Sequence, residues 1–127
     1  MIIGIGTDII RVERLAKAIE ANERFVERVF TTAEIEYCNS KATPALSFAV
    51  RFAAKEAVMK ALGTGWDGVV NWQDIEVTKD ALGCPLLNFY GATKQLMATK
   101  GVVRTHLSLS HEKEYAVAYA ILEGNDQ

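Results

Sequence analysis

Apolar and polar residues along this chain follow two different periods, which predicts a mixture of strands and helices. The opening run MIIGIG (residues 1–6) is rich in β-branched residues and ends in glycine, so it predicts a short buried strand. THLSLS (105–110) and YAVAYAIL (115–122) alternate with a period of two, and they predict two more strands joined by the segment HEKE. DIEV (74–77) and PLLNFY (85–90) predict a further hairpin.

The longest helical pattern runs from about Pro44 to Leu62. Proline suits the first helical position, Thr43 before it is a candidate N-cap, and Gly63 suits the position after the last turn. One side of this helix carries bulky apolar residues and another side carries mostly alanines, so the helix is expected to be buried on two sides.

Shorter helices are expected before and after the long one. The segment 12–30 has a helical pattern with a break near Asn22. A capping box formed by Thr31 and Glu34 predicts another helix directly after that segment. Residues 92–100 predict a last short helix, which a glycine then stops.

Composition narrows the class of protein. The chain has 127 residues, half of them hydrophobic and about a quarter charged, which is typical of a soluble globular protein. With no repeat and no low-complexity linker, we expect residues 1–127 to form a single α+β domain, in which the long central helix packs on a mostly antiparallel sheet. The net charge of −2 argues against a general nucleic-acid binder, which usually has a basic excess.

The cysteines and the N-terminus favour a cytoplasmic location. Cys38 and Cys84 are far apart and match no zinc-binding motif, so both are interpreted as reduced thiols. The first residues lack the basic segment of a signal peptide, and no run approaches the ~20 apolar residues of a membrane span.

Four charges interrupt the long helix, at Arg51, Lys55, Glu56 and Lys60. They fall in the seams between its two apolar faces, with Glu56 and Lys60 as i,i+4 neighbours in one seam and Arg51 and Lys55 in the other. One interpretation is a set of surface ion pairs worth ~0.3–0.5 kcal/mol each. The other is that charges kept in a buried helix meet a ligand, and the pattern alone leaves both open.

Two further segments carry candidate chemistry. GIGTD (4–8) lacks the third glycine of a dinucleotide fingerprint, so Asp8 is either the cap of the next helix or a site residue delivered by the strand. In THLSLSH, His106 and Ser108 lie on one strand face, which is either solvent-exposed or able to donate hydrogen bonds to phosphate oxygens. GTG (63–65) alone predicts only a helix end and a turn.

Taken together, three segments resemble one family. GIGTDIIRVER, RFAAKEAVMKALGTG and HLSLSH…YAVAYAI are similar, in this order and spacing, to the holo-acyl carrier protein synthases, the short single-domain class of 4′-phosphopantetheinyl transferases. The resemblance covers essentially the whole chain. It implies transfer of the 4′-phosphopantetheine group of coenzyme A to a serine of apo-acyl carrier protein, with release of adenosine 3′,5′-bisphosphate, in fatty acid biosynthesis.

The resemblance also implies a site and an assembly. Mg²⁺ would be held by Asp8 and Glu56, and Lys60 would meet the pyrophosphate as a point charge. Either Glu56 or a metal-bound water would take the proton of the acceptor serine. The enzyme would be a homotrimer with active sites at the subunit interfaces. The further candidates for coenzyme A contacts are Arg51, Gly63, Thr64, Gly65, His106 and Ser108.

Docking of an acidic carrier protein requires a local basic patch, because the chain itself is slightly acidic. The first helical segment offers Arg14, Lys17, Arg24 and Arg28, which would gather on one side of a continuous helix. Two rival functions remain from the residues alone: another Mg²⁺-dependent phosphoryl or nucleotidyl hydrolase, and a non-catalytic trimeric binding module.

Overall fold

The computed structural model describes residues 1–64 and 70–126, which form two antiparallel sheets and a set of helices. The three-stranded sheet has the order β1-β5-β4, and β2 and β3 form a separate hairpin. In chain order the elements are β1 (Ile2–Arg11), α1 (Val12–Ala21), α2 (Phe25–Val29), α3 (Thr32–Asn39), α4 (Pro44–Leu62), the 3-10 turn η1 (Trp72–Asp74), β2 (Ile75–Lys79), β3 (Pro85–Phe89), α5 (Gly91–Thr99), β4 (Arg104–His111) and β5 (Tyr115–Glu123).

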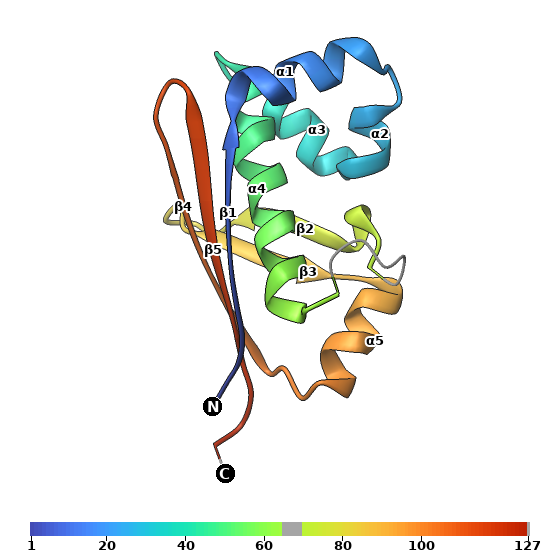
Figure 1. Ribbon diagram of the computed structural model, residues 1–127, viewed down its shortest axis with the longest axis vertical. Coiled ribbons are helices and arrows are strands. Elements are labelled where there is room, and N and C mark those ends of the chain that lie inside the picture. Colours follow the sequence, from blue (N-terminus) through green and yellow to red (C-terminus); the bar gives the residue numbers. More distant parts are fainter. Residues whose placement is uncertain (65–69, 127) are drawn as a thin grey trace.

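Helix α4 runs alongside the three-stranded sheet, with α1, α2 and α3 gathered toward one end of the molecule and α5 toward the other (Figure 1). The sheet turns its small residues to the helix, because the alanines of β5 at positions 116, 118 and 120 are fully buried. Small residues on both surfaces let a helix and a sheet approach closely. The expected α+β architecture, with a long helix on an antiparallel sheet, is confirmed.

The bounds predicted for α4 are also confirmed. Pro44 occupies the first turn, and Gly63 ends the helix with a φ of 75°, a left-handed conformation that costs glycine little. Thr43 stands at the N-cap position, but its side chain makes no capping hydrogen bond. Most of the α4 side chains are buried, as expected for a helix that is covered on two sides.

Strand β1 is longer than the sequence pattern indicates. It continues past the glycines to Arg11, because it pairs with β5 along its whole length, for example Asp8 opposite Ala118. Asp8 therefore lies within the strand and not at its end. Helix α1 begins only at Val12, with Arg11 at its N-cap, so the alternative role of Asp8 as a helix cap is wrong.

The local signals for the remaining elements are confirmed. The first helical segment breaks at Asn22 into α1 and α2. Thr31 and Glu34 form the predicted capping box of α3, with the Thr31 hydroxyl accepting from the Glu34 backbone N–H at 3.2 Å. The hairpins β2–β3 and β4–β5 form as the alternating patterns predict.

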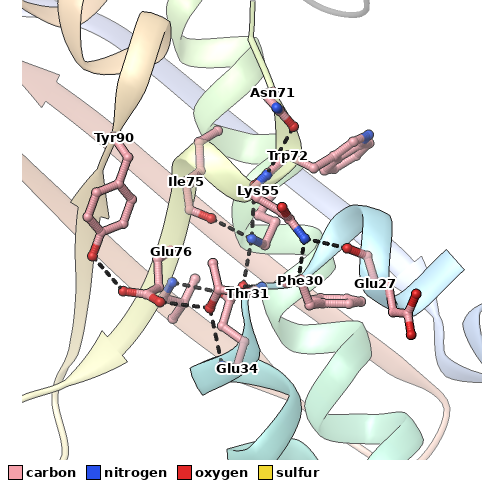
Figure 2. A network of polar contacts seen from close by, with 12 residues as sticks. Glu27, Phe30, Thr31, Glu34, Lys55, Asn71, Trp72, Ile75, Glu76 and Tyr90 are labelled. Carbon is pink, nitrogen blue, oxygen red and sulfur yellow. Dashed lines mark hydrogen bonds and ion pairs between the residues drawn. The ribbon is translucent and has the colours of Figure 1, made fainter. Parts of the chain in front are cut away.

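A buried ion pair ties α3, α4 and β2 together (Figure 2). The Lys55 ammonium lies 2.8 Å from a carboxylate oxygen of Glu34, and both side chains are completely buried. Lys55 also donates to the carbonyl oxygens of Trp72, at 3.0 Å, and Ile75, while Glu34 accepts from the backbone N–H of Val77 at 2.9 Å. The charge of Lys55 is thus paired inside the protein, and the expectation that it meets a ligand is wrong.

Candidate functional site

Asp8 and Lys60 meet where β1 crosses α4. The Lys60 ammonium lies 3.1 Å from a carboxylate oxygen of Asp8, and it also donates to the carbonyl oxygen of Thr7 at 3.0 Å. Glu56 precedes Lys60 by four residues on α4, so the two side chains share one face of the helix. The structure thus brings together Asp8, Glu56 and Lys60, at a place where Asp8 is largely buried and Lys60 is half exposed.

The two carboxyl groups lie in an environment that disfavours their charged forms. Burial raises the pKa of Glu56, and the negative charge of Asp8 raises it further. Burial also raises the pKa of Asp8, although Lys60 and Arg14 act in the opposite direction. A cation bound between the two carboxylates would favour their charged forms and offset the cost of burying them.

The donor set of this site fits Mg²⁺. Mg²⁺ prefers oxygen ligands and is usually held by one or two carboxylates together with water and substrate phosphates. Asp8 and Glu56 supply two carboxylates beside an open surface. Among the described residues, no cluster of three or more histidine, cysteine or acidic side chains is placed to hold a metal ion, and the candidate site consists of these two carboxylates alone.

Arg51 lies in a second basic region. Its side chain is 5% exposed, and its guanidinium carbon lies 4.1 Å from the centre of the Tyr37 ring. The ammonium groups of Lys41 and Lys79 lie 4.6 Å and 4.9 Å from the same ring centre. Within residues 1–64 and 70–126, the buried Nε atom of Arg51 has no hydrogen-bond partner.

A cavity of about 260 Å³ opens beside Arg51. Its polar lining includes Lys79 and His111 together with Tyr37, and none of the described residues contributes a carboxylate side chain to it. Hydrogen bonding to Lys79 is the main cause that lowers the pKa of the Tyr37 hydroxyl, which reflects the concentrated positive charge. A cavity with this lining is suited to an anionic group such as a phosphate.

Sequence reasoning missed most of this cavity. Tyr37 and Lys79 come from α3 and β2, belong to no motif, and were not singled out as candidates. The sequence pattern predicts a turn at His111, whereas the structure has it as the last residue of β4, where it lines the cavity. The only sequence signal was Arg51, whose charge interrupts an apolar helix.

His106 and Ser108 lie elsewhere. They alternate along β4 with the half-buried Leu107 and Leu109, so they point away from α4 on the outer face of the sheet. His106 Nε2 lies 2.9 Å from a carboxylate oxygen of Glu123. Within one chain, these two side chains are not brought together with Asp8, Glu56 and Lys60.

The glycine-containing segment follows the site residues of α4 directly. Gly63 ends the helix one turn after Lys60, and the Thr64 backbone N–H bonds to the carbonyl oxygen of Met59 at 3.3 Å. Gly65 lies outside the described residues. Gly63 and Thr64 therefore lie directly after the last turn of α4, which carries Lys60.

The candidate docking residues fall into two groups. Arg14 of α1 is exposed, and its charge lowers the pKa of both Asp8 and Glu56, which places it beside the site. Arg24 and Arg28 are exposed after the break in the helix, so they do not share one continuous helix with Arg14. Lys17 pairs with Glu13 of its own helix at 3.0 Å.

Comparisons with known proteins agree on one family. The model of the 4′-phosphopantetheinyl transferase superfamily matches residues 4–120. The holo-[acyl-carrier-protein] synthase of Koribacter versatilis is 50% identical over 124 residues, which are 97% of this chain and 99% of that protein. The crystal structure of the Neisseria meningitidis synthase matches with a TM-score of 0.90 at 35% identity, covering 97% of this chain and 99% of the other. The synthase of Bacillus anthracis, solved in complex with CoA (3′,5′-ADP), matches with a TM-score of 0.82 at 38% identity, covering 98% and 99%.

Proposed function

This chain belongs to the holo-[acyl-carrier-protein] synthases of the 4′-phosphopantetheinyl transferase superfamily, and we propose that it performs their reaction with Mg²⁺ at Asp8 and Glu56. The enzyme transfers the 4′-phosphopantetheine group of coenzyme A to a serine of apo-acyl carrier protein and releases adenosine 3′,5′-bisphosphate. The observation that carries the metal proposal is the meeting of two carboxylates and Lys60 where β1 crosses α4.

The residues of this site match the needs of attack on a pyrophosphate. Negative charge develops on the phosphate oxygens, and a bound Mg²⁺ supplies charge neutralisation there. Asp8 and Glu56 would hold the ion, and the half-exposed Lys60 ammonium would contact the pyrophosphate as a point charge. The Asp8–Lys60 ion pair orients both side chains before any substrate binds.

The cavity beside Arg51 is where we propose that the nucleotide end of coenzyme A binds. Among the described residues, the buried Nε donor of Arg51 has no partner, and Lys79 and His111 add further donors to the same cavity. We assign this cavity to phosphate groups of the nucleotide, with Arg51 as the principal contact. A contact from His106 or Ser108 stays a prediction, and it requires a nucleotide that reaches the outer face of the sheet in an assembly.

The outer face of the three-stranded sheet supports the proposed homotrimer. Ile5, Ile9 and Tyr119 are 59%, 65% and 52% exposed there. On β5, Ile121 and Val117 stand opposite Ile5 and Ile9. An apolar sheet face of this kind is normally covered by another protein surface. The number of three subunits, with active sites at their interfaces, comes from the family resemblance.

The carrier protein and the cellular location belong to the same proposal. Arg14 stands beside the carboxylates, where an acidic carrier would have to present its serine. Among the described residues, none of the helices combines the length and the apolar character that crossing a membrane needs. We place the enzyme in the cytoplasm, where it supplies active carrier protein for fatty acid biosynthesis.

Mass spectrometry of a carrier protein tests the function. Apo-acyl carrier protein is incubated with this protein, coenzyme A and Mg²⁺, and a carrier with its acceptor serine replaced by alanine is the control. We expect one phosphopantetheine group on the parent carrier only, and none when a chelator removes Mg²⁺. Cleavage of coenzyme A without any carrier would favour a hydrolase, and binding without any product would favour a non-catalytic module.

A further inference from the structure

Strand β1 and helix α4 touch backbone to backbone at two glycines. A Cβ atom added at Gly4 would lie 2.0 Å from the carbonyl oxygen of Ala61, and one added at Gly6 would lie 1.8 Å from the carbonyl oxygen of Ala57. Contacts of a Cβ below 3.0 Å are essentially never seen in proteins. Because the opposing atoms belong to the helix backbone, no side-chain rotation can relieve the clash.

The two contacts repeat in step along strand and helix. Two residues of a strand advance about 6.6 Å, and four residues of a helix advance about 6.0 Å, so Gly4 and Gly6 face successive turns of α4. The next residue on this strand face is Asp8. Asp8 is therefore the first residue on this face after the glycines that carries a side chain, and its carboxylate lies 3.1 Å from Lys60 on α4.

Lys60 holds the strand from the helix side. Its ammonium contacts the carbonyl oxygen of Thr7 at 3.0 Å and the carboxylate of Asp8 at 3.1 Å. The glycine contact thus sets how near the strand comes, and Lys60 sets how Asp8 is turned. Glu56 is attached to the same helix, so the separation of the two carboxylates depends on the distance between β1 and α4.

We propose that Gly6 is a positioning residue, which keeps the carboxylates of Asp8 and Glu56 close enough to select a small dication. This inference rests on the proposed Mg²⁺ site. Mg²⁺ requires near-ideal octahedral geometry at about 2.0–2.1 Å, whereas Ca²⁺ accepts flexible geometry at about 2.3–2.6 Å. Any side chain at position 6 must move the Cβ contact from 1.8 Å to at least 3.0 Å, which widens the site.

The experiment compares Gly6→Ala with Gly4→Ala. Both variants place a methyl group against the α4 backbone at nearly the same distance, but Gly4 lies farther from Asp8 along the strand. Mg²⁺ and Ca²⁺ are titrated separately into each protein by calorimetry in the presence of coenzyme A. Circular dichroism and thermal unfolding report whether each variant is folded.

The two explanations of the glycines give different results. If Gly6 positions the carboxylates, the Mg²⁺ affinity of Gly6→Ala falls by about tenfold or more, in the range seen when groups that orient metal ligands are removed. The Ca²⁺ affinity of Gly6→Ala falls less. Gly4→Ala keeps the ratio of Mg²⁺ affinity to Ca²⁺ affinity of the parent protein. If the glycines only permit packing, both variants lose stability and both keep the parent ratio, which would overturn the proposal.

If Gly6→Ala does not fold, the variant Asp8→Glu tests the proposal instead. This change lengthens the carboxylate by one methylene group and leaves the glycine contact untouched. A preference set by the separation of the carboxylates predicts a changed ratio of Mg²⁺ affinity to Ca²⁺ affinity here too, and an unchanged ratio would overturn the proposal. Failure of the parent protein to bind either ion would instead contradict the metal site itself, and the glycine role would fall with it.

Discussion

At the scale of single residues, Asp8 and Glu56 are acidic groups whose ionised forms are disfavoured by the protein alone. Burial raises the pKa of both, and their mutual repulsion adds to the pKa of Glu56. A group kept charged at a cost to the fold is typical of a functional site. Lys60 offsets only part of that cost, because its ammonium is half exposed.

Replacing either carboxylate by its amide should abolish transfer without unfolding the protein. We expect Glu56→Gln and Asp8→Asn each to lower kcat/KM by about 10²-fold or more, because a transition-state charge loses its stabilisation. Stability should be unchanged or higher, since the neutral amide avoids burial of a charge. Steady-state kinetics with a carrier protein and thermal unfolding measure the two effects. Near-normal turnover of either folded variant at ordinary Mg²⁺ would contradict the assignment.

The raised pKa of Glu56 also predicts a pH dependence of stability. The folded state holds this proton more tightly than the unfolded state, so the contribution of Glu56 is present at acid pH and is lost as pH rises through the raised folded pKa. As pH rises through that range, the Tm of the metal-free parent should therefore fall relative to the Tm of Glu56→Gln. Saturating Mg²⁺ should reverse the difference, because the ion binds the ionised carboxylate of the parent. A constant difference across pH would contradict the raised pKa.

At the scale of elements, α4 carries at adjacent positions a charge that is buried in an ion pair and a charge that we assign to the proposed metal site. Lys55 points to α3 and β2 and is completely buried against Glu34 (Figure 2). Glu56, the next residue, belongs to the carboxylate pair at β1. A rotation of about 100° per residue separates the two side chains. The helix can therefore bury Lys55 on one side and present Glu56 on another.

Breaking the buried pair should be costly. Lys55→Met leaves the Glu34 carboxylate buried without its partner, and we expect a loss of about 3–5 kcal/mol in the free energy of unfolding. The double variant Lys55→Met, Glu34→Gln should lose less, because no unpaired charge remains. Lys17→Met is the matched control, since it removes an exposed pair with Glu13 and should cost under about 0.5 kcal/mol. Urea unfolding measures all three, and an unchanged midpoint for Lys55→Met would contradict this role.

Helix α1 carries the prediction for the protein substrate. Arg14→Glu should raise the KM for the carrier protein and leave coenzyme A binding nearly unchanged, because Arg14 is exposed beside the site. The on-rate of the carrier should fall with added salt, as expected for electrostatic steering. Lys94→Glu on α5 is the control, an exposed cation at the other end of the molecule (Figure 1). Unaltered carrier kinetics in an Arg14→Glu, Arg24→Glu double variant would move the docking surface elsewhere.

At the scale of the whole molecule, the outer face of the three-stranded sheet exposes large apolar side chains to solvent. Tyr119 stands at its centre, with Thr7 of β1 on one side and Ser108 of β4 on the other. The inner face of the same strands is covered by α4. An exposed apolar face of this kind is typical of a surface that binds another protein, as the proposed trimer requires.

Tyr119→Asp should therefore disrupt the assembly. We expect light scattering to give a trimer for the parent protein and a smaller species for the variant, because a charge would be buried at the interface. Leu82→Asp is the control, since Leu82 is 90% exposed in the β2–β3 hairpin and not on the outer face. Activity should fall with the assembly, because the proposed active sites lie at the subunit interfaces. A parent protein that is a stable, active monomer would rule the trimer out.

The sequence by itself determined the elements with local signals. Pro44 and Gly63 bound α4 because each acts on its own backbone, and Thr31 with Glu34 caps α3 within four residues. The i,i+4 spacing of Glu56 and Lys60 likewise placed them together on one helix face. The family resemblance rested on the same short segments, and the comparisons confirmed it.

The tertiary structure alone decided the features that join distant segments. The partner of Lys55 lies 21 residues away on another helix, and no local pattern links it to Glu34. Strand β1 extends past its glycines because β5 pairs with it, and the cavity beside Arg51 gathers Tyr37 and His111 from separate elements. Such contacts depend on how helices and strands pack, and packing is a property of the whole chain that local spacing does not contain.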